Sequence, residues 1–402
     1  MKTASAKLKM RLTGAVTPEE VLSLPEEVLS RFDSDEYTCL PGFFDAHVHF
    51  REPGFSYKET ILTGSLAAAH GGFTGTAAMP NLDPVPDSLP HLEEELTLIR
   101  RDAVIPVLPY GALTVGEKGA EAADIEGMAP FVFAFSDDGR GVQDEGLMRD
   151  LMARVRETGK VLAAHCEVNA LLRGGVIHDG VFAASHGYPG ISSASEWKMI
   201  ERDLRLAAET GCPYHVCHIS AKESVALIRE AKAEGVDVTC ETAPHYLVFC
   251  DEDLAEEGRY KMNPPVRSRA DREALIEGIA DGTVDMIATD HAPHSAEEKA
   301  KGLSGSPFGV VGLETAFPAV YTSLVQPGII TLDRAVELMS DRPRKRFGVT
   351  APSGFSVWNL NESEEIDPDF FLSMGKATPF AHKTLTAVNH LTVWNGRIVF
   401  RK

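Results

Sequence analysis

The sequence lacks the features that mark secreted and membrane proteins. None of its six cysteines forms a CxxC pair, and most stand inside apolar runs, as reduced and buried thiols do in cytosolic proteins. Residues 1–16 carry basic side chains but no apolar stretch, so we expect no secretory signal. No uninterrupted apolar run approaches the length of a membrane span. We therefore expect a cytoplasmic protein that has no attachment to a membrane.

Positive charge is also scarce. The chain has 39 Lys and Arg residues against 59 Asp and Glu residues, which gives a net charge of -20. Binding to phosphates needs clustered Lys and Arg, so this balance argues against nucleic acid as the main partner. The length of 402 residues suits one large domain with a smaller appendage.

Short apolar runs alternate with longer amphipathic segments from Leu40 onward. Eight runs are expected to be strands: LPGFFDAHVHF, FTGTAAMP, AVIPVLPYGA, FVFAFSDD, KVLAAHCE, YHVCHIS, VDVTCETAP and DMIATDHAP. The segments between them have helical patterns, and several end in glycine, as helices often do. Such an alternation over roughly 250 residues predicts an α/β fold of the (β/α)8 TIM-barrel type. A doubly wound open sheet is the alternative, but no glycine-rich phosphate turn follows the first run.

The two ends of the chain differ from this middle part. Residues 1–38 form a poorly patterned lead-in. In residues 351–402, the segments FSVWNLNESEEIDP and LTVWNGRIVFRK alternate apolar and polar residues and contain an Asn–Gly turn signal. We predict a barrel over residues 39–350 and a small β subdomain formed mainly by the C-terminal tail, with the lead-in as a further part of it.

Histidine and aspartate gather at the C-terminal ends of the predicted strands. In chain order they are His47 and His49, Asp137 and Asp138, His165, His218, and Asp290. The C-terminal ends of all barrel strands meet at one face, where active sites lie, so these residues should converge. His215 stands three residues before His218, so its side chain should point to the opposite face and belong to the core.

The spacing of His47 and His49 predicts two imidazoles on the same side of a strand, where they can hold one metal ion. Each other member has an ordinary interpretation by itself: Asp138 as a turn former, Asp290 as a helix cap, and the remaining histidines as core residues. Together, four imidazoles and two carboxylates exceed what one tetrahedral zinc needs and can fill two sites if one carboxylate bridges them. Zinc is favoured, although manganese, cobalt and iron accept the same ligand types.

Nine segments in order resemble the class I (bacterial-type) dihydroorotases of the amidohydrolase superfamily. They are PGFFDAHVHFREPG, AAMPNLDPVPD, FSDDGRGVQ, AAHCEVNALL, YHVCHISAKES, CETAPHYL, KMNPPVRS, IATDHAPHSAEEK and SPFGVVGLETAFP. The resemblance implies a distorted barrel with a binuclear zinc centre and a bridging hydroxide. It also implies the reversible cyclisation of N-carbamoyl-L-aspartate to L-dihydroorotate and water, the third step of de novo pyrimidine synthesis. A cytosolic homodimer is expected, with aspartate transcarbamoylase as a candidate partner.

The resemblance also assigns roles to single residues. It implies that His47, His49 and Asp290 bind the first metal, that His165 and His218 bind the second, and that Asp138 bridges them. Many amidohydrolases have a carbamylated lysine in place of that bridge. Asp290 would also carry the proton between the hydroxide and the ring nitrogen. The residues implied to bind the substrate are Arg51, Asn81 and His294 for the carboxylate, and Asn263 with the backbone of Phe308 and Gly309 for the ring amide.

Alternatives stay open at several points. Arg51 can instead pair with Glu52, and Asn263 can serve only as a turn residue before two prolines. The segment HSAEEKAKGLSGSPFGVVG is expected to form a loop over the barrel mouth, either as a mobile lid or as a passive connection. Another cyclic amidase, a hydantoinase or allantoinase, is the nearest alternative function, and a barrel without catalytic activity is the more distant one.

Overall fold

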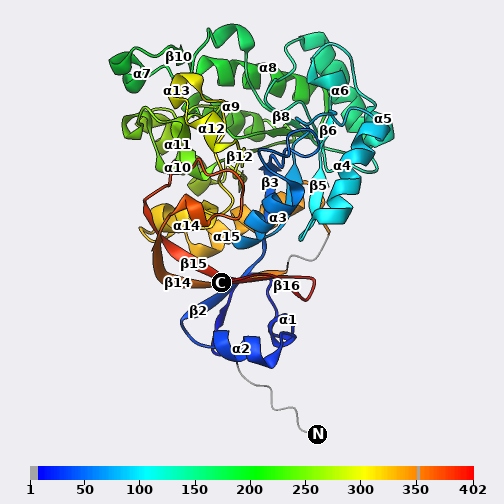
Figure 1. Ribbon diagram of the computed structural model, residues 1–402. Helices are drawn as coiled ribbons and strands as arrows, with labels where there is room; N and C mark the ends of the chain where they lie inside the picture. Colours follow the sequence, from blue (N-terminus) through cyan, green and yellow to red (C-terminus); the bar gives the residue numbers. More distant parts are fainter. Residues whose placement is uncertain (1–7, 351–353) are drawn as a thin grey trace.

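The computed structural model describes residues 8–350 and 354–402, and its centre is a barrel of parallel strands surrounded by helices (Figure 1). Each predicted apolar run contains one barrel strand. The strands are β3 (Phe43–Val48), β4 (Phe73–Ala78), β5 (Val107–Pro109) with β6 (Gly111–Ala112), β7 (Phe135–Ser136), β8 (Leu162–Ala164), β11 (Tyr214–Val216), β12 (Val238–Thr242) and β13 (Met286–Ile287).

Two parallel sheets close into this barrel at two seams. One sheet has the order β3-β4-β5 and the other the order β6-β7-β8-β11-β12-β13. At the first seam, β5 and β6 lie on either side of Tyr110 in one continuous run. At the second seam, Val48 and His291 form a parallel bridge, and the Thr289 N–H donates to the Asp45 carboxylate at 3.2 Å. The prediction of a (β/α)8 barrel is therefore confirmed.

Amphipathic helices cover the outside of the barrel. The longer ones are α3 (Ile61–His70), α4 (Leu89–Asp102), α6 (Glu145–Thr158), α8 (Ala194–Thr210), α9 (Lys222–Ala233) and α11 (Arg269–Asp281). Helix α6 illustrates why they form. The Asp144 side chain caps its first turn, Gly159 ends it with a φ of 71°, and its buried side chains recur at helical spacing: Met148, Leu151, Met152 and Val155.

Shorter helices lie in the connections between the barrel elements and after the last strand. They are α5 (Ile125–Met128), α7 (Val181–His186), α10 (Pro244–Val248), α12 (Ala296–Lys299), α13 (Gly302–Gly305), α14 (Ala316–Val320), α15 (Leu332–Val336) and α16 (Arg342–Arg346). Strands β9 (Ile177–His178) and β10 (Gly190–Ile191) form a separate parallel pair. Helices α12 and α13 belong to the segment that was predicted to lie over the mouth, and the mobility of that segment stays a prediction.

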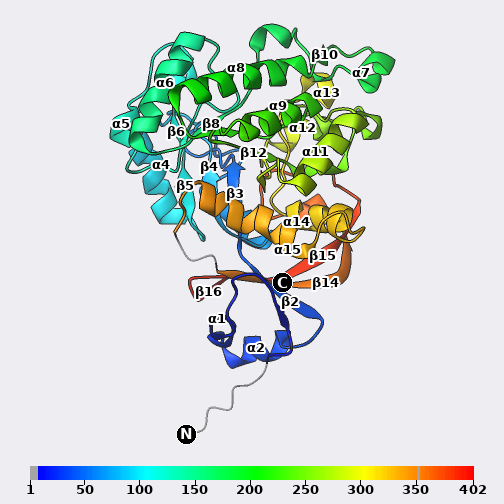
Figure 2. The same cartoon turned by 180° about the vertical axis from the view of Figure 1, so that it is seen from behind.

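A second sheet joins the two ends of the chain, and we call it the terminal sheet. Its order is β1-β2-β14-β15-β16. The strands are β1 (Arg11–Leu12), β2 (Tyr37–Pro41), β14 (Phe355–Glu365), β15 (Thr384–Trp394) and β16 (Arg397–Arg401). It lies with helices α1 (Pro18–Leu22) and α2 (Glu26–Phe32) at one end of the molecule (Figures 1 and 2). The predicted domain boundaries stay predictions: β2 runs across residues 38 and 39, and Ala351 lies outside the described residues.

The terminal sheet has its own apolar core. The residues of this core are Met10, Val16, Val21, Leu24, Val28, Phe32, Cys39, Phe355, Val357, Leu391 and Val393. Strand β2 continues into β3 with only Gly42 between them, so the sheet is tied directly to the first barrel strand. In the parts of the chain that the structure describes, no helix is both long and apolar enough to cross a membrane.

Candidate functional site

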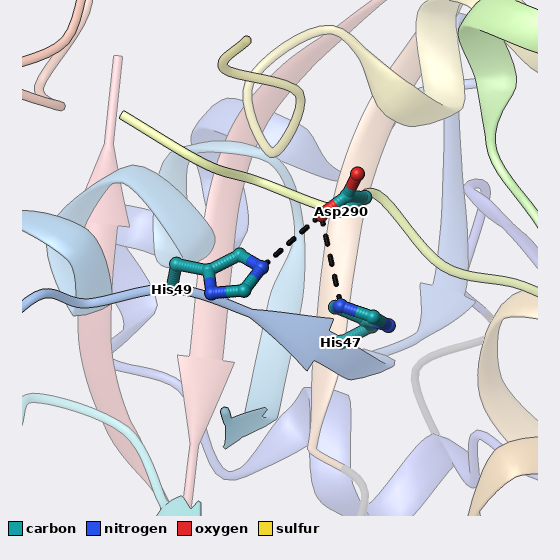
Figure 3. Close-up of side chains that lie close together, drawn as sticks. All are labelled: His47, His49 and Asp290. Carbon is teal, nitrogen blue, oxygen red and sulfur yellow. Dashed lines mark hydrogen bonds and ion pairs between the residues drawn. The ribbon is translucent and has the colours of Figure 1, made fainter. Parts of the chain in front are cut away.

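Side chains from the two strands at the closing seam come together at the C-terminal ends of the barrel strands. His47 and His49 project from the end of β3, and Asp290 follows β13 (Figure 3). The Asp290 Oδ1 atom lies 3.2 Å from His49 Nε2 and 3.6 Å from His47 Nε2. All three side chains are buried. The structure therefore brings together residues that are more than two hundred positions apart, as the strand pattern predicted.

Asp138 lies between this group and a second pair of histidines. Its Oδ1 atom is 3.4 Å from His47 Nε2, 3.5 Å from His218 Nε2 and 3.8 Å from His165 Nδ1. Its Oδ2 atom is 3.5 Å from His49 Nε2. One carboxylate thus reaches imidazole nitrogens of both pairs, which is the position that a bridging ligand needs.

The donor atoms of this site fit bound metal cations. His47 Nε2 and Asp138 Oδ1 are buried and have no hydrogen-bond partner among the described residues. Leaving such a group unsatisfied costs about 1–3 kcal/mol, so the fold holds these atoms ready for a further partner. Two groups have ligand atoms that all lie within 4.8 Å of one another: His47, His49 and Asp290, and His47, Asp138 and His218. Imidazole nitrogens with carboxylate oxygens are the ligands of zinc and related cations.

Burial and charge act against each other in this cluster. Burial by itself lowers the pKa of His47, but the carboxylates of Asp138 and Glu241 outweigh it and raise that pKa well above the usual value. Burial would likewise raise the pKa of Asp138, yet the imidazoles of His47 and His218 hold it well below the usual range. The carboxylate is therefore ionised, as a metal ligand has to be.

The backbone is strained at three of the predicted site residues. Arg51, His218 and Asp290 have φ angles of 60°, 31° and 49°, in the left-handed region that side chains other than glycine seldom adopt. Such a conformation costs of order 1–3 kcal/mol per residue and persists only where the surrounding structure enforces it. All three residues lie two or three positions beyond the ends of their strands, which are β3, β11 and β13.

Glu241 supports the cluster from below, and the sequence analysis did not identify it. This β12 residue accepts hydrogen bonds from His47 Nδ1 at 2.7 Å, from His215 Nε2 at 3.1 Å and from the His218 N–H at 3.3 Å. A carboxylate behind a ligating imidazole fixes its ring orientation and increases its basicity. The glutamate inside the apolar run VDVTCETAP was the available signal, because a charged residue in a buried strand needs a partner. His215 is buried, as predicted, and contributes to this support.

Arg51 and Asn81 lie beside the cluster, as predicted. Arg51 Nε donates to the Pro293 carbonyl at 3.3 Å. Glu52, the alternative partner of Arg51, accepts instead from the Ile61 N–H at 3.0 Å. Asn81 Oδ1 is 2.8 Å from His49 Nδ1, so this amide orients the ring of a predicted metal ligand and keeps its own N–H groups available.

His294 is held on both sides of its ring. Its Nε2 donates to the Phe308 carbonyl at 2.7 Å, and its Nδ1 lies 3.2 Å from Lys58 Nζ. Burial, together with the charges of Arg51 and Lys58, lowers the pKa of His294 to about 3. The imidazole is therefore neutral at physiological pH, and Nδ1 accepts the hydrogen bond from the lysine.

The backbone around Phe308 and Gly309 is pinned within the protein. The Gly309 N–H donates to the Lys261 carbonyl at 3.0 Å, and Lys299 Nζ donates to the Gly309 carbonyl at 2.7 Å. Gly309 has a φ of 128°, and a Cβ atom there would stand 3.0 Å from His294 Nε2, so a larger residue does not fit. The predicted contact of this backbone with a ring amide stays a prediction.

Asn263 contacts a residue that the sequence analysis also missed. Its Nδ2 donates to Glu167 Oε1 at 2.8 Å, while its own Oδ1 is buried and has no hydrogen-bond partner among the described residues. Glu167 stands two positions after His165, at the end of the same strand run. The rule that places functional residues at strand ends could therefore have found it.

The comparisons with solved structures identify the class of fold. The L-hydantoinase (dihydropyrimidinase) from Arthrobacter aurescens is 26% identical with a TM-score of 0.82, and the match covers 91% of this chain and 86% of that one. A D-hydantoinase (dihydropyrimidinase) from a Thermus species shares the fold, with 22% identity, a TM-score of 0.78 and coverage of 91% and 85%. With the histidines and aspartates at its strand ends, the chain is an amidohydrolase-type barrel whose site could hold metal ions.

The sequence comparisons narrow this class to one family. Residues 37–224 match the family model described as dihydro-orotase-like. The dihydroorotase of Fusobacterium nucleatum is 50% identical over 367 residues, which is 89% of this chain and 86% of that protein. The dihydroorotase of Bacillus caldolyticus is 47% identical over 405 residues, with coverage of 98% and 94%. The chain belongs to the dihydroorotase family, and the resemblance found in its motifs is confirmed.

Proposed function

We propose that this chain interconverts N-carbamoyl-L-aspartate and L-dihydroorotate, with release of water on ring closure, and so serves the third step of de novo pyrimidine synthesis. The observation that carries the proposal is the position of Asp138 within 3.8 Å of nitrogens from four histidines, with the charge of Arg51 near enough to interact with Asp138 and Asp290. Dihydroorotate is a cyclic ureide that carries a carboxylate, so it needs both parts of this site. The histidine and aspartate cluster, with its metals, can activate the amide carbonyl, and the guanidinium of Arg51 can hold the carboxylate.

The proposed metal content is two zinc ions per chain. His47, His49 and Asp290 would hold one, His165 and His218 would hold the other, and Asp138 would bridge them. Two such cations polarise a carbonyl oxygen and lower the pKa of a bound water toward neutrality. The imidazole-rich ligand set favours zinc over magnesium or calcium.

Arg51 and Asn81 are proposed to bind the carboxylate of the substrate. A planar guanidinium donates two parallel hydrogen bonds to a carboxylate, which fixes its orientation as well as its position. The Asn81 amide has its oxygen turned to His49, so its N–H groups are the donors that it can offer. His294 is neutral and accepts from Lys58, so it serves best by holding that lysine and the Phe308 carbonyl in place.

Asp290 is proposed to move the proton. Burial opposes its ionisation, but the hydrogen bond from His49 and the nearby charge of His47 lower its pKa, so it is available as a base. Its Oδ1 faces His49 and His47, which leaves Oδ2 to accept and return a proton. In ring opening this oxygen would pass a proton to the leaving ring nitrogen, and in ring closure it would take one from the ureido nitrogen.

The Asp290→Asn variant tests this proposal. We expect turnover in both directions to fall by about 10²–10⁴-fold, because the amide cannot accept the proton. The assay follows dihydroorotate hydrolysis and its reverse, with metal content measured on the same samples. A loss of less than tenfold would contradict the role of Asp290, and a wild-type chain without either activity would contradict the function itself.

A hydantoinase activity is the second candidate, because the chain shares its fold with an L-hydantoinase at 26% identity. The two functions differ in what they require at the rim. A hydantoin ring need not carry a carboxylate, so Arg51 would have no substrate group to bind. Turnover of dihydroorotate, hydantoin and allantoin by one preparation separates the candidates, and we expect dihydroorotate to be preferred by orders of magnitude.

For assembly and location, we propose a homodimer in the cytosol. All six cysteines are unpaired and buried, which suits a reducing compartment. Light scattering on the purified chain tests the dimer. Mixing the chain with aspartate transcarbamoylase in the same experiment tests the proposed association with that enzyme.

A further inference from the structure

We propose that Glu167 is a positioning residue that locks the Asn263 amide with its oxygen toward the substrate, so that the site selects an unsubstituted ring N–H. The proposal rests on the proposed function, in which Asn263 contacts the ring. It adds a second residue to that contact and names the chemical group that the contact recognises.

The contacts of Glu167 place it between His165 of the cluster and Asn263. Glu167 is 7% exposed. Its Oε1 accepts from Asn263 Nδ2 at 2.8 Å, and its Oε2 lies 3.7 Å from His165 Nε2. Its backbone is also held, since its carbonyl accepts from Gln143 Nε2 at 2.9 Å. The carboxylate is therefore a fixed point against which the amide of Asn263 is oriented.

The hydrogen bond to Glu167 decides which way the amide faces. Glu167 Oε1 accepts from Asn263 Nδ2 at 2.8 Å. Turning the Asn263 amide over would place its oxygen against the Glu167 oxygen, so this hydrogen bond would be lost and two acceptor atoms would face each other. The amide nitrogen therefore stays on Glu167.

The consequence appears at the other end of the amide. Asn263 Oδ1 is buried without a hydrogen-bond partner among the described residues, so it is an acceptor that awaits a donor. The ring of dihydroorotate carries N–H groups that can satisfy it. A carbonyl or an N-methyl group in the same place would leave the oxygen unpaired, which a buried polar site rejects strongly.

A comparison of single and double variants tests the inference on the metal-loaded enzyme. We expect Glu167→Ala to raise the KM for dihydroorotate about ten- to a hundredfold, the range for a lost charge-assisted hydrogen bond, with kcat changed less than threefold. Glu167→Gln keeps an oxygen acceptor but loses the charge, so its KM should lie between those of the wild type and Glu167→Ala. Asn263→Ala should raise KM to a similar extent, and the double variant should be no worse than Asn263→Ala.

Two controls separate this role from a structural one. Glu157→Ala, at an exposed position on α6, should leave KM and kcat unchanged. Metal content should stay at the wild-type level in both Glu167 variants, because the contact with His165 is long. A third measurement compares orotate with its two ring N-methyl derivatives as inhibitors. The wild-type enzyme should bind orotate more tightly than at least one of these derivatives. Glu167→Ala should lose that preference.

Three results would overturn the inference. The first is a KM increase in the double variant that equals the product of the two single-variant increases. The second is a loss of metal in Glu167→Gln. The third is a preference for orotate over a methyl derivative that is as large in Glu167→Ala as in the wild type. A wild-type chain without dihydroorotase activity would overturn the proposed function together with this inference, whereas any of these three results in an active enzyme overturns the inference alone.

Discussion

We call the C-terminal ends of the barrel strands, with the histidines and aspartates that gather there, the rim. The rim and the terminal sheet bury side chains for opposite reasons. At the rim, the buried groups are imidazoles and carboxylates, four of them have an atom with no hydrogen-bond partner among the described residues, and three rim residues have left-handed backbones. In the terminal sheet, an apolar core encloses Val21, Phe32 and Val357, and a buried polar side chain such as Thr392 has a hydrogen-bond partner. The comparison teaches that the buried polar groups at the rim destabilise the fold and are kept for their chemistry. Apolar burial in the rest of the molecule, including the terminal sheet, offsets that loss of stability.

Because of this difference, we expect substitutions in the two regions to affect different properties, namely activity at the rim and stability in the terminal sheet. A change at the rim should reduce activity or metal binding by orders of magnitude, with a small effect on the unfolding of the metal-free chain. A change in the terminal sheet should lower the free energy of unfolding and leave the activity of each folded molecule intact. The predictions below test this division, beginning with the largest effect.

Asp138→Asn should have the largest effect. Asp138 is the carboxylate placed to reach both histidine pairs, and an amide is a poor bridge between two cations. We expect turnover to fall by about 10³-fold or more, the equivalent of several kcal/mol, together with lower metal content. Dihydroorotate hydrolysis and elemental analysis measure both. Asp150→Asn, at an exposed position on α6, is the matched control, and an active Asp138→Asn enzyme with full metal content would remove the bridge from the proposal.

Phe32→Ala should have the next largest effect, and it should act on stability. Phe32 is 0% exposed on α2, with its ring 5.3 Å from the edge-on ring of Tyr37. Removing a buried phenyl ring costs about 3–5 kcal/mol, because burial is lost and a cavity is left. Urea unfolding measures this loss, with Leu22→Ala at an exposed position as control. If kcat fell as well at temperatures where the variant is folded, the two regions would be coupled and the division would fail.

Glu241→Gln tests whether a residue behind the predicted ligands also contributes to metal binding. A glutamine can keep one hydrogen bond to His47 or His215 but not the charge that raises the basicity of the ligating ring. Loss of such a partner typically lowers metal affinity by about 10–100-fold. Competition with a chromophoric chelator measures the affinity, and Glu234→Gln, at an exposed position directly after α9, is the control. Unchanged affinity would restrict Glu241 to a packing role.

The positions of the rim residues could be predicted from the sequence because one rule covers them. Polar residues at the ends of apolar strands must meet at the mouth of a barrel, and His47, Asp138 and Asp290 do so. The supporting residues could not be placed in this way. Glu241 lies inside its strand and Glu167 beyond its end, and their partners come from other strands, so only the folded distances show whom they contact.

The terminal sheet was harder to predict, for a different reason. Its central pairing joins β2 to β14, with Thr38 opposite Trp358, and alternation of apolar residues does not say which strand is the partner across three hundred positions. The lead-in appeared unpatterned, although it contained a helix signal. Thr17 and Glu20 form a capping box at the start of α1, with the Thr17 N–H donating to Glu20 Oε2 at 2.8 Å.

Lys299→Met should have the smallest effect, and it tests how far the rim reaches into the loop after β13. Lys299 Nζ donates to the carbonyls of Lys261, Pro307 and Gly309 at 3.0, 3.0 and 2.7 Å. Methionine fills a similar volume but leaves these carbonyls without the donor, so the backbone beside His294 should loosen. We expect KM for dihydroorotate to rise about three- to tenfold with kcat nearly unchanged, because no reacting group is touched.

The matched control for this loop is Lys301→Met, two positions further on and exposed, which should leave KM unchanged. If both variants behaved like the wild type, the loop backbone would have no part in substrate binding, and the predicted contact through Phe308 and Gly309 would be lost with it. If Lys299→Met instead lowered kcat as strongly as a ligand substitution, the loop would act on the metal centre. The rim would then be one cooperative unit, in which Lys299, Glu167 and the ligands cannot be changed independently.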